Sequence, residues 1–123
     1  MGVYPGPGEG HPDRKELVLS RSKETILQNQ IICALCAEGC FAANHTVGNF
    51  WTQYGGRVKV GTPGEADIWG HRADGRALFI EVKLPGEEPR PEQQLFLDAM
   101  ARTGAIAGCA HSVKEALEIV RRN

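Results

Sequence analysis

The feature that most constrains this 123-residue chain is an apolar run that ends in charge. Ala77-Leu78-Phe79-Ile80 leads directly into Glu81-Val82-Lys83, and Pro85-Gly86 follows. A continuous apolar run between turn signals is typical of a strand that is buried on both faces of a sheet. The sequence therefore predicts a central strand over residues 76–84, with an acid and a lysine near its end.

Other patterns predict the elements around this strand. A helix is expected from Ser20 or Ser22 to Glu38, stopped by Gly39, and a second from Pro91 to Thr103, closed by Gly104. Short strands are expected at 41–46, 57–60, 66–69 and 105–110, a polar turn at 47–49, and a last helix after Ser112. The predicted order is α-β-β-β-β-α-β-α, in one domain over residues 16–123 after a flexible arm at 1–15.

The composition limits the function classes. No apolar run approaches the roughly 20 residues of a membrane span, and the first residues lack an apolar signal core, so a cytoplasmic protein is expected. A net charge of −1 does not suit a protein that coats nucleic acid. Any DNA contact would therefore use local basic clusters, of which there are four: Arg14 and Lys15, Arg21 and Lys23, Arg57 and Lys59, Arg72 and Arg76.

Two further groups of residues have alternative interpretations. Cys33, Cys36 and Cys40 have a spacing that suggests a metal or redox site, but no second pair completes it, so core thiols are the favoured interpretation. The aromatic residues Phe50, Trp51 and Tyr54 could stack on bases or pack against the sheet, and packing is favoured.

The central stretch carries the chemistry of a phosphodiesterase. Glu81 and Lys83 are two residues apart, so on a strand they point to one face, where Asp67 of the preceding strand can meet them. Carboxylates that hold Mg²⁺ or Mn²⁺ can bind a phosphate and lower the pKa of an attacking water. The alternative is a structural salt bridge between Glu81 and Lys83. Glu24, in the first helix, is either a partner of the helix dipole or a member of the site.

As a set, these motifs resemble the VRR-NUC family of the PD-(D/E)XK nuclease superfamily. The matched residues are spread over about residues 22–120: Glu24 with Gln28, Asn44, Gly64-x-x-Asp67, Glu81-Val82-Lys83, Gln93 before Phe96, and Gly104. Ala66 stands where the superfamily name has proline.

The resemblance implies an α/β fold with a restriction-endonuclease-like core, in which helices flank a mixed central β-sheet. It implies that Asp67, Glu81, the Val82 backbone carbonyl and Glu24 bind Mg²⁺ or Mn²⁺. Lys83 would orient or activate the water, and Gln93 would support the site or contact the phosphate.

The stand-alone viral and bacterial members of this family are similar in length to this chain. The resemblance to them implies a homodimeric, structure-specific DNA endonuclease of the type that resolves four-way (Holliday) junctions. Two alternatives stay open: a nuclease for flaps or other branched DNA, and a nucleic-acid-binding module that has kept the fold and lost catalysis.

Overall fold

The computed structural model describes residues 14–45 and 48–122. Its elements, in chain order, are α1 (Arg14–Ala37), β1 (Phe41–Asn44), β2 (Gly48–Trp51), β3 (Arg57–Val60), β4 (Ile68–His71), β5 (Ala77–Val82), α2 (Pro91–Arg102), β6 (Ile106–Ala110) and α3 (Val113–Val120).

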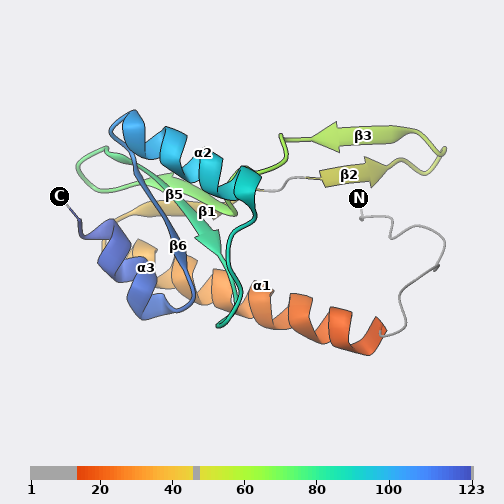
Figure 1. Cartoon of the computed structure of the whole chain (residues 1–123), viewed down its shortest axis with the longest axis horizontal. Helices are drawn as coiled ribbons and strands as arrows, with labels where there is room; N and C mark the ends of the chain where they lie inside the picture. The colour runs from red at the N-terminus through yellow and green to blue at the C-terminus, as the bar shows by residue number, and fades with distance from the viewer. Residues whose placement is uncertain (1–13, 46–47, 123) are drawn as a thin grey trace.

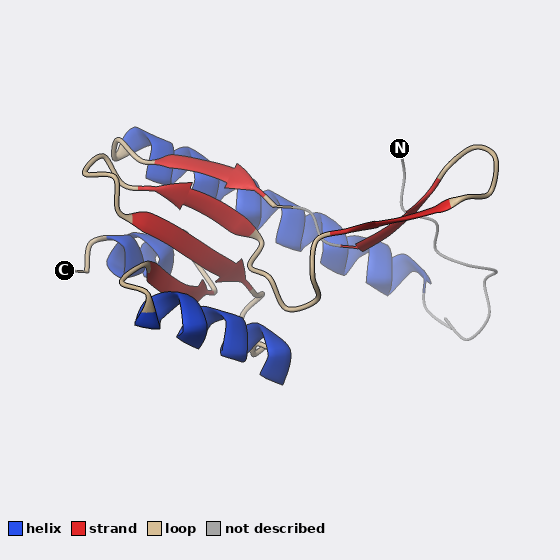
Figure 2. Ribbon diagram, turned by 90° about the horizontal axis from the view of Figure 1, so that it is seen from above, coloured by secondary structure: helices blue, strands red, loops and turns tan. Residues whose placement is uncertain are grey.

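Four of the strands form a mixed sheet in the order β1-β4-β5-β6. The β1–β4 and β4–β5 pairs are antiparallel, and the β5–β6 pair is parallel, joined through α2. Helices α1 and α3 cover one face of this sheet and α2 covers part of the other (Figures 1 and 2). The fold is therefore the predicted α/β architecture, with a mixed central sheet between helices.

The main hydrophobic core lies between the sheet and the α1–α3 layer. Strand β5 contributes Leu78, Ile80 and Val82, all fully buried, as the continuous apolar run predicted. Ile31 and Leu35 of α1 are also fully buried against this face. Because side chains alternate along a strand, Phe79 and Glu81 point to the opposite face, toward α2.

The first helix begins earlier than predicted. It starts at Arg14, because residues 14–37 contain no glycine or proline and the stretch Arg14-Lys15-Glu16-Leu17 consists of good helix formers. The predicted boundary of the flexible arm at residue 15 is therefore wrong for Arg14 and Lys15. The rest of the predicted arm, residues 1–13, lies outside the described residues.

The strands also differ from the prediction in two places. Gly48 and Asn49, expected in a turn, belong to β2, which pairs with β3 as a separate two-stranded sheet. The structure therefore has one strand more before α2 than the predicted order. Asp67, expected inside a strand, precedes β4, and its side-chain carboxylate accepts the Val82 backbone N–H at 2.9 Å.

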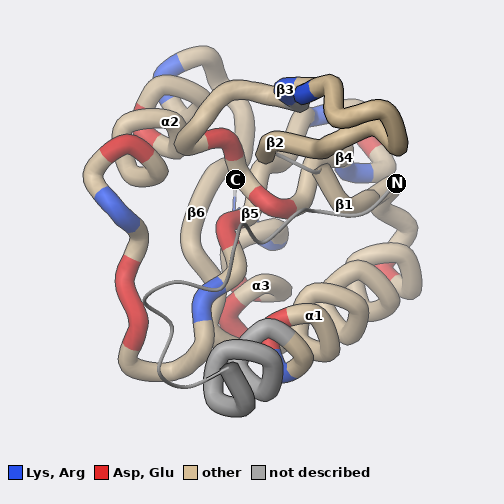
Figure 3. The backbone as a smooth tube through the Cα atoms, turned by 90° about the vertical axis from the view of Figure 1, so that its right-hand side faces the viewer, with Lys and Arg blue, Asp and Glu red and all other residues tan. Residues whose placement is uncertain are grey.

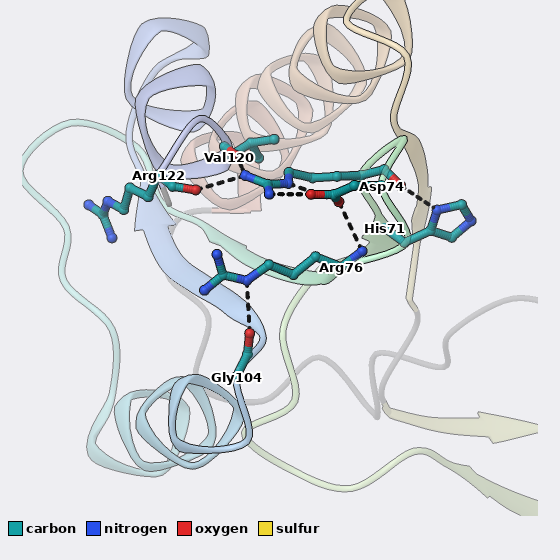
Figure 4. A network of polar contacts seen from close by, with 7 residues as sticks. His71, Asp74, Arg76, Gly104, Val120 and Arg122 are labelled. Carbon is teal, nitrogen blue, oxygen red and sulfur yellow. Dashed lines mark hydrogen bonds and ion pairs between the residues drawn. The ribbon is translucent and has the colours of Figure 1, made fainter.

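A network around Arg72 fixes the end of the sheet that lies far from β2 and β3 (Figure 4). Arg72 pairs with Asp74 and donates through Nη1 to the carbonyl oxygens of Val120, at 3.2 Å, and Arg122, at 2.7 Å. Arg76 donates through Nε to the Gly104 carbonyl at 2.8 Å. These two arginines, a candidate DNA-contact cluster in the sequence, thus hold the β4–β5 turn against the segments that follow α2 and α3.

None of the described helices is both long and apolar enough to cross a membrane.

The loop before β4 packs tightly against α2 and generates a prediction. Gly64 has a φ of +97°, and a Cβ placed on it would lie 2.7 Å from the Glu92 carbonyl oxygen. Gly64→Ala is expected to lower the free energy of unfolding by about 2–4 kcal/mol, through the combined cost of positive φ and overpacking. Urea denaturation measures this change.

Gly86→Ala is the matched control. Gly86 has a φ of +89°, but a Cβ there would meet nothing within 4 Å. This variant is expected to lose only about 1 kcal/mol, from the backbone conformation alone. Equal losses in the two variants would contradict the packing argument for Gly64.

Candidate active site

The site is built around Glu81, a carboxylate buried at the end of β5. Its side chain is 1% exposed, and its Oε1 accepts a hydrogen bond from Gln93 Nε2 at 3.3 Å. Gln93 is itself buried in the first turn of α2, where its Oε1 accepts the Arg90 backbone N–H at 2.8 Å. The start of α2 therefore holds Gln93 against Glu81.

Asp67 reaches the same place from the loop before β4. Its carboxylate accepts the Val82 N–H, which is the peptide group next to Glu81, and its carbonyl accepts the His45 N–H at 2.7 Å. The charge of Asp67 acts directly on Glu81 and is one of the causes of its raised pKa. The two acids that the sequence paired thus lie next to each other in the fold.

Glu24 and Lys83 complete the charged group. Helix α1 passes the carboxyl end of β5, and the charges of Asp67 and Lys83 both influence the half-buried Glu24. The Glu24 side chain also hydrogen-bonds Gln28, one turn further along α1. Lys83 is half-buried and interacts electrostatically with both Glu24 and Glu81, without an ion pair to any described side chain.

This crowding of acids has a clear electrostatic signature. Burial, and then the neighbouring Asp67, raise the pKa of Glu81 to about 9. Burial, and then Asp67, also raise the pKa of Glu24. Lys83 acts in the opposite direction on both acids, but one lysine does not offset the three carboxylates. Figure 3 shows acidic segments gathered around the end of β5. The protein itself therefore supplies less positive charge at this site than the three carboxyl groups need when all are ionised.

The donor set suits a divalent cation with oxygen ligands. Glu81 Oε2 is buried and receives no hydrogen bond from an N–H donor among the described residues, and the neighbouring Asp67 carboxyl helps to raise its pKa. A divalent cation between the two carboxyl groups would take the place of the retained proton. The described residues contain no group of three or more His, Cys, Asp or Glu side chains at metal-binding spacing. Mg²⁺, however, keeps several waters and binds through one or two carboxylates. Asp67 and Glu81 fit that requirement, with Glu24 nearby.

Comparison with solved structures finds the same architecture in a protein described as "VRR_NUC domain". The two structures align with a TM-score of 0.60 and 20% sequence identity, over 81% of this chain and 96% of that domain. This chain has the VRR-NUC fold. No family model and no curated protein matches the sequence. The fold predicted from the motif set is thus confirmed, although the sequence identity is low.

Within the VRR-NUC fold, His45 is a member of the site region that sequence reasoning did not assign to it. Its Nε2 contacts Glu65 Oε2 at 2.6 Å, and its ring stacks on Trp69 with centroids 3.9 Å apart. Glu65 also accepts the Thr62 N–H at 2.6 Å, which closes the loop before Asp67. His45 and Glu65 therefore hold the backbone on both sides of Asp67. Nothing in the sequence marks His45 as part of the site, because it follows a short strand and has no other potential ligand at a characteristic spacing.

The four cysteines do not gather into a cluster of potential metal ligands among the described residues. Cys33 and Cys36 are exposed, so the prediction of core thiols is wrong for these two residues, which lie on the outer side of α1. Cys40 and Cys109 are half-buried, and Cys40 packs against the main core, as predicted. His45, the next histidine in the chain after these thiols, contacts Glu65 instead of a cysteine. A metal site on these thiols has no support among the described residues.

The aromatic residues after β1 also differ from the favoured interpretation. Phe50 and Trp51 lie in the separate β2–β3 sheet, and Tyr54, in the turn between these strands, is 89% exposed. Packing against the central sheet, the favoured interpretation, is therefore wrong for Tyr54. The side chains that do pack on the α2 face of the sheet are Trp69, Phe79 and Phe96, with centroids 5.2–6.1 Å apart.

The raised pKa of Glu81 predicts how stability depends on pH. Between its ordinary value of 4.5 and about 9, Glu81 keeps a proton in the folded chain that the unfolded chain releases. The free energy of unfolding in EDTA should therefore fall as the pH rises through this window. Glu81→Gln removes the titration and still accepts from Gln93, so it should be more stable than wild type by about 1–3 kcal/mol at pH 8.

Urea titrations of both proteins from pH 5 to 9 test this expectation, with Glu118→Gln, an exposed acid of α3, as the control. Equal pH slopes in wild type and Glu81→Gln would contradict the assignment. Addition of Mg²⁺ or Mn²⁺ should stabilise wild type and not Glu81→Gln, because a metal must displace the proton to bind the carboxylate.

Proposed function

We propose that this protein is a metal-dependent DNA endonuclease that hydrolyses phosphodiester bonds. The observation that carries the proposal is the buried Glu81 carboxyl group at the end of β5, which lies beside the Asp67 carboxyl of the preceding loop and interacts with Lys83. A structural salt bridge, the alternative interpretation of Glu81 and Lys83, would be expected to pair the two side chains directly. No such pair occurs between these two described residues.

Each residue has a defined part in the proposed reaction. Asp67 and Glu81 hold Mg²⁺ or Mn²⁺, with the Val82 carbonyl and Glu24 as further oxygen donors toward the metal or its waters. Lys83, half-buried and without an ion pair to a described side chain, is available to orient the attacking water or contact the phosphate. Gln93 fixes the orientation of the Glu81 carboxylate through its hydrogen bond.

The chemistry requires a cation because both substrate and site are negative. A bound divalent ion supplies charge stabilisation for the phosphate in the transition state and lowers the pKa of a coordinated water. The raised pKa values of Glu81 and Glu24 support this part of the proposal, because burial and the neighbouring Asp67 disfavour the charged carboxylates, which a bound cation would stabilise. Pairs of acids with perturbed pKa values cluster at functional sites.

For the substrate we propose branched DNA, with four-way junctions as the first candidate. The support is the VRR-NUC fold together with the resemblance of the motif set to stand-alone members of that family. We also propose a homodimer, because two symmetric cuts across a junction need two sites related by a twofold axis. Flap or other branched substrates form the second candidate for the same chemistry.

Cleavage assays on labelled DNA test the proposed site. Asp67→Asn keeps an oxygen that can accept the Val82 N–H but removes the charge, and Lys83→Ala removes the ammonium group. Both variants are expected to lose at least about 100-fold in cleavage rate with Mg²⁺ or Mn²⁺, and EDTA should abolish cleavage by wild type. DNA binding, measured in EDTA, should persist in both.

Matched controls are Asp98→Asn, an exposed acid of α2, and Lys114→Ala, an exposed lysine of α3, which should cut at the wild-type rate. Undiminished cleavage by Asp67→Asn and Lys83→Ala would reject the site. Wild-type protein that binds DNA but cuts none of the substrates would instead support the inactive binding module. A junction cut no faster than linear duplex would reject the junction preference while leaving the nuclease in place.

A further inference from the structure

Strands β2 and β3 form a ribbon that stands apart from the body of the protein (Figures 1 and 2). The ribbon consists of Gly48–Trp51, Arg57–Val60 and the connecting residues 52–56. Its strands pair with each other and with no strand of the central sheet among the described elements. An isolated two-stranded ribbon is marginally stable in water and contributes little to a core. Its position therefore calls for a role other than folding.

The register of the ribbon sorts its side chains into two faces. Trp51 lies opposite Arg57 and Asn49 lies opposite Lys59, so these four residues share one face, and all four are exposed. Phe50 lies opposite Val58 on the other face, where Phe50 is half-buried. One face thus combines an aromatic ring, an amide and two cations in a single row.

The tip of the ribbon presents a second aromatic ring. The Thr52 N–H donates to the Gly56 carbonyl at 2.7 Å, and Thr52 Oγ1 accepts the Gly56 N–H at 3.0 Å. These bonds close the turn, and Tyr54 at its end is 89% exposed. An aromatic ring on a defined turn at the end of a ribbon can stack on an unpaired base.

The charge of the ribbon points to a polyanion. Residues 48–60 contain Arg57 and Lys59 and no aspartate or glutamate, in a chain whose net charge is −1. Figure 3 shows this basic segment on β3, while acidic segments gather around β5. The competing cluster of Arg72 and Arg76 is held by Asp74 and by backbone carbonyls at the far end of the sheet. Arg57 and Lys59 have no such partners among the described residues.

The base of the ribbon is joined to the candidate active site. His45 precedes β2 and Glu65 follows β3, and their contact at 2.6 Å closes the base. The His45 N–H also donates to the Asp67 carbonyl at 2.7 Å. The segments that lead into and out of the ribbon thus meet beside the backbone of a proposed metal ligand.

We infer that the β2–β3 ribbon is a DNA-contacting arm, in which Arg57 and Lys59 bind backbone phosphates and Tyr54 stacks on a base exposed at a branch point. This inference rests on the proposed nuclease and names the surface by which it holds its substrate. A duplex offers phosphates but no unstacked base, so Tyr54 contributes to the recognition of branched DNA, and the two cations contribute to the binding of any DNA.

Fluorescence anisotropy of the full chain in EDTA measures binding without cleavage. Tyr54→Ala is expected to weaken binding to a four-way junction about tenfold and to leave binding to linear duplex nearly unchanged. The Arg57→Ala/Lys59→Ala variant should weaken binding to both and lower the slope of log affinity against log salt by about two. With 2-aminopurine at the branch point, wild type should quench the fluorescence and Tyr54→Ala should not.

The matched control is Arg102→Ala/Lys114→Ala, which removes the same charge from the ends of α2 and α3. Both control residues are exposed, and this variant should bind junction like wild type. If the ribbon variants bind junction as tightly as wild type, the inference is overturned, whether or not wild type cuts DNA. If wild type binds through the ribbon and cuts no substrate, the proposed nuclease fails and the ribbon assignment stands.

The alternative is that the ribbon contacts a second copy of this chain instead of DNA. Analytical ultracentrifugation of the same variants separates the two possibilities. Ribbon variants that keep the wild-type mass while losing affinity for DNA support a direct contact. A fall in mass that accompanies the loss of DNA binding in both ribbon variants would overturn the inference, since the ribbon would then join two copies.

Discussion

The hydrogen bond from the Val82 N–H to the Asp67 carboxylate joins the loop before β4 to the end of β5, at 2.9 Å. It places a second acid beside the buried Glu81 and replaces the backbone carbonyl that a regular strand would offer. The Asp67 backbone carbonyl accepts the His45 N–H at 2.7 Å and so extends the pairing of β1 with β4 by one residue. Asp67 thus contacts β5 through its side chain and the segment after β1 through its backbone.

The acids gathered at this site lower the free energy of unfolding of the protein without a bound ligand. Burial of an acid costs free energy, and burial is the first cause of the raised pKa values of Glu81 and of the half-buried Glu24. The aliphatic core on the α1–α3 side, with Ile80 and Val82 fully buried next to Glu81, offsets it. A fold that tolerates this cost is one in which the acids have a task beyond packing.

The acidic and the basic side chains lie in different parts of the fold. The acids are gathered and partly buried at the end of β5, where a cation can bind them. The cations of β3 are placed on an exposed ribbon, where solvent reduces their mutual repulsion and a polyanion can reach them. Because the two groups are separated, Arg57 and Lys59 do not neutralise Glu81. The acids and the cations therefore both remain available to ligands.

The sequence by itself determined the central strand, the pair of Glu81 and Lys83, and Gln93 at the start of α2, because apolar runs, strand period and proline-led helices are local signals. Only the tertiary structure decided the rest. The position of Asp67 outside a strand and the exposure of Cys33 and Tyr54 depend on which surfaces meet. The contact between His45 and Glu65 joins residues twenty positions apart. No local pattern encodes such a contact, because its partners meet only when β1 and β4 pair.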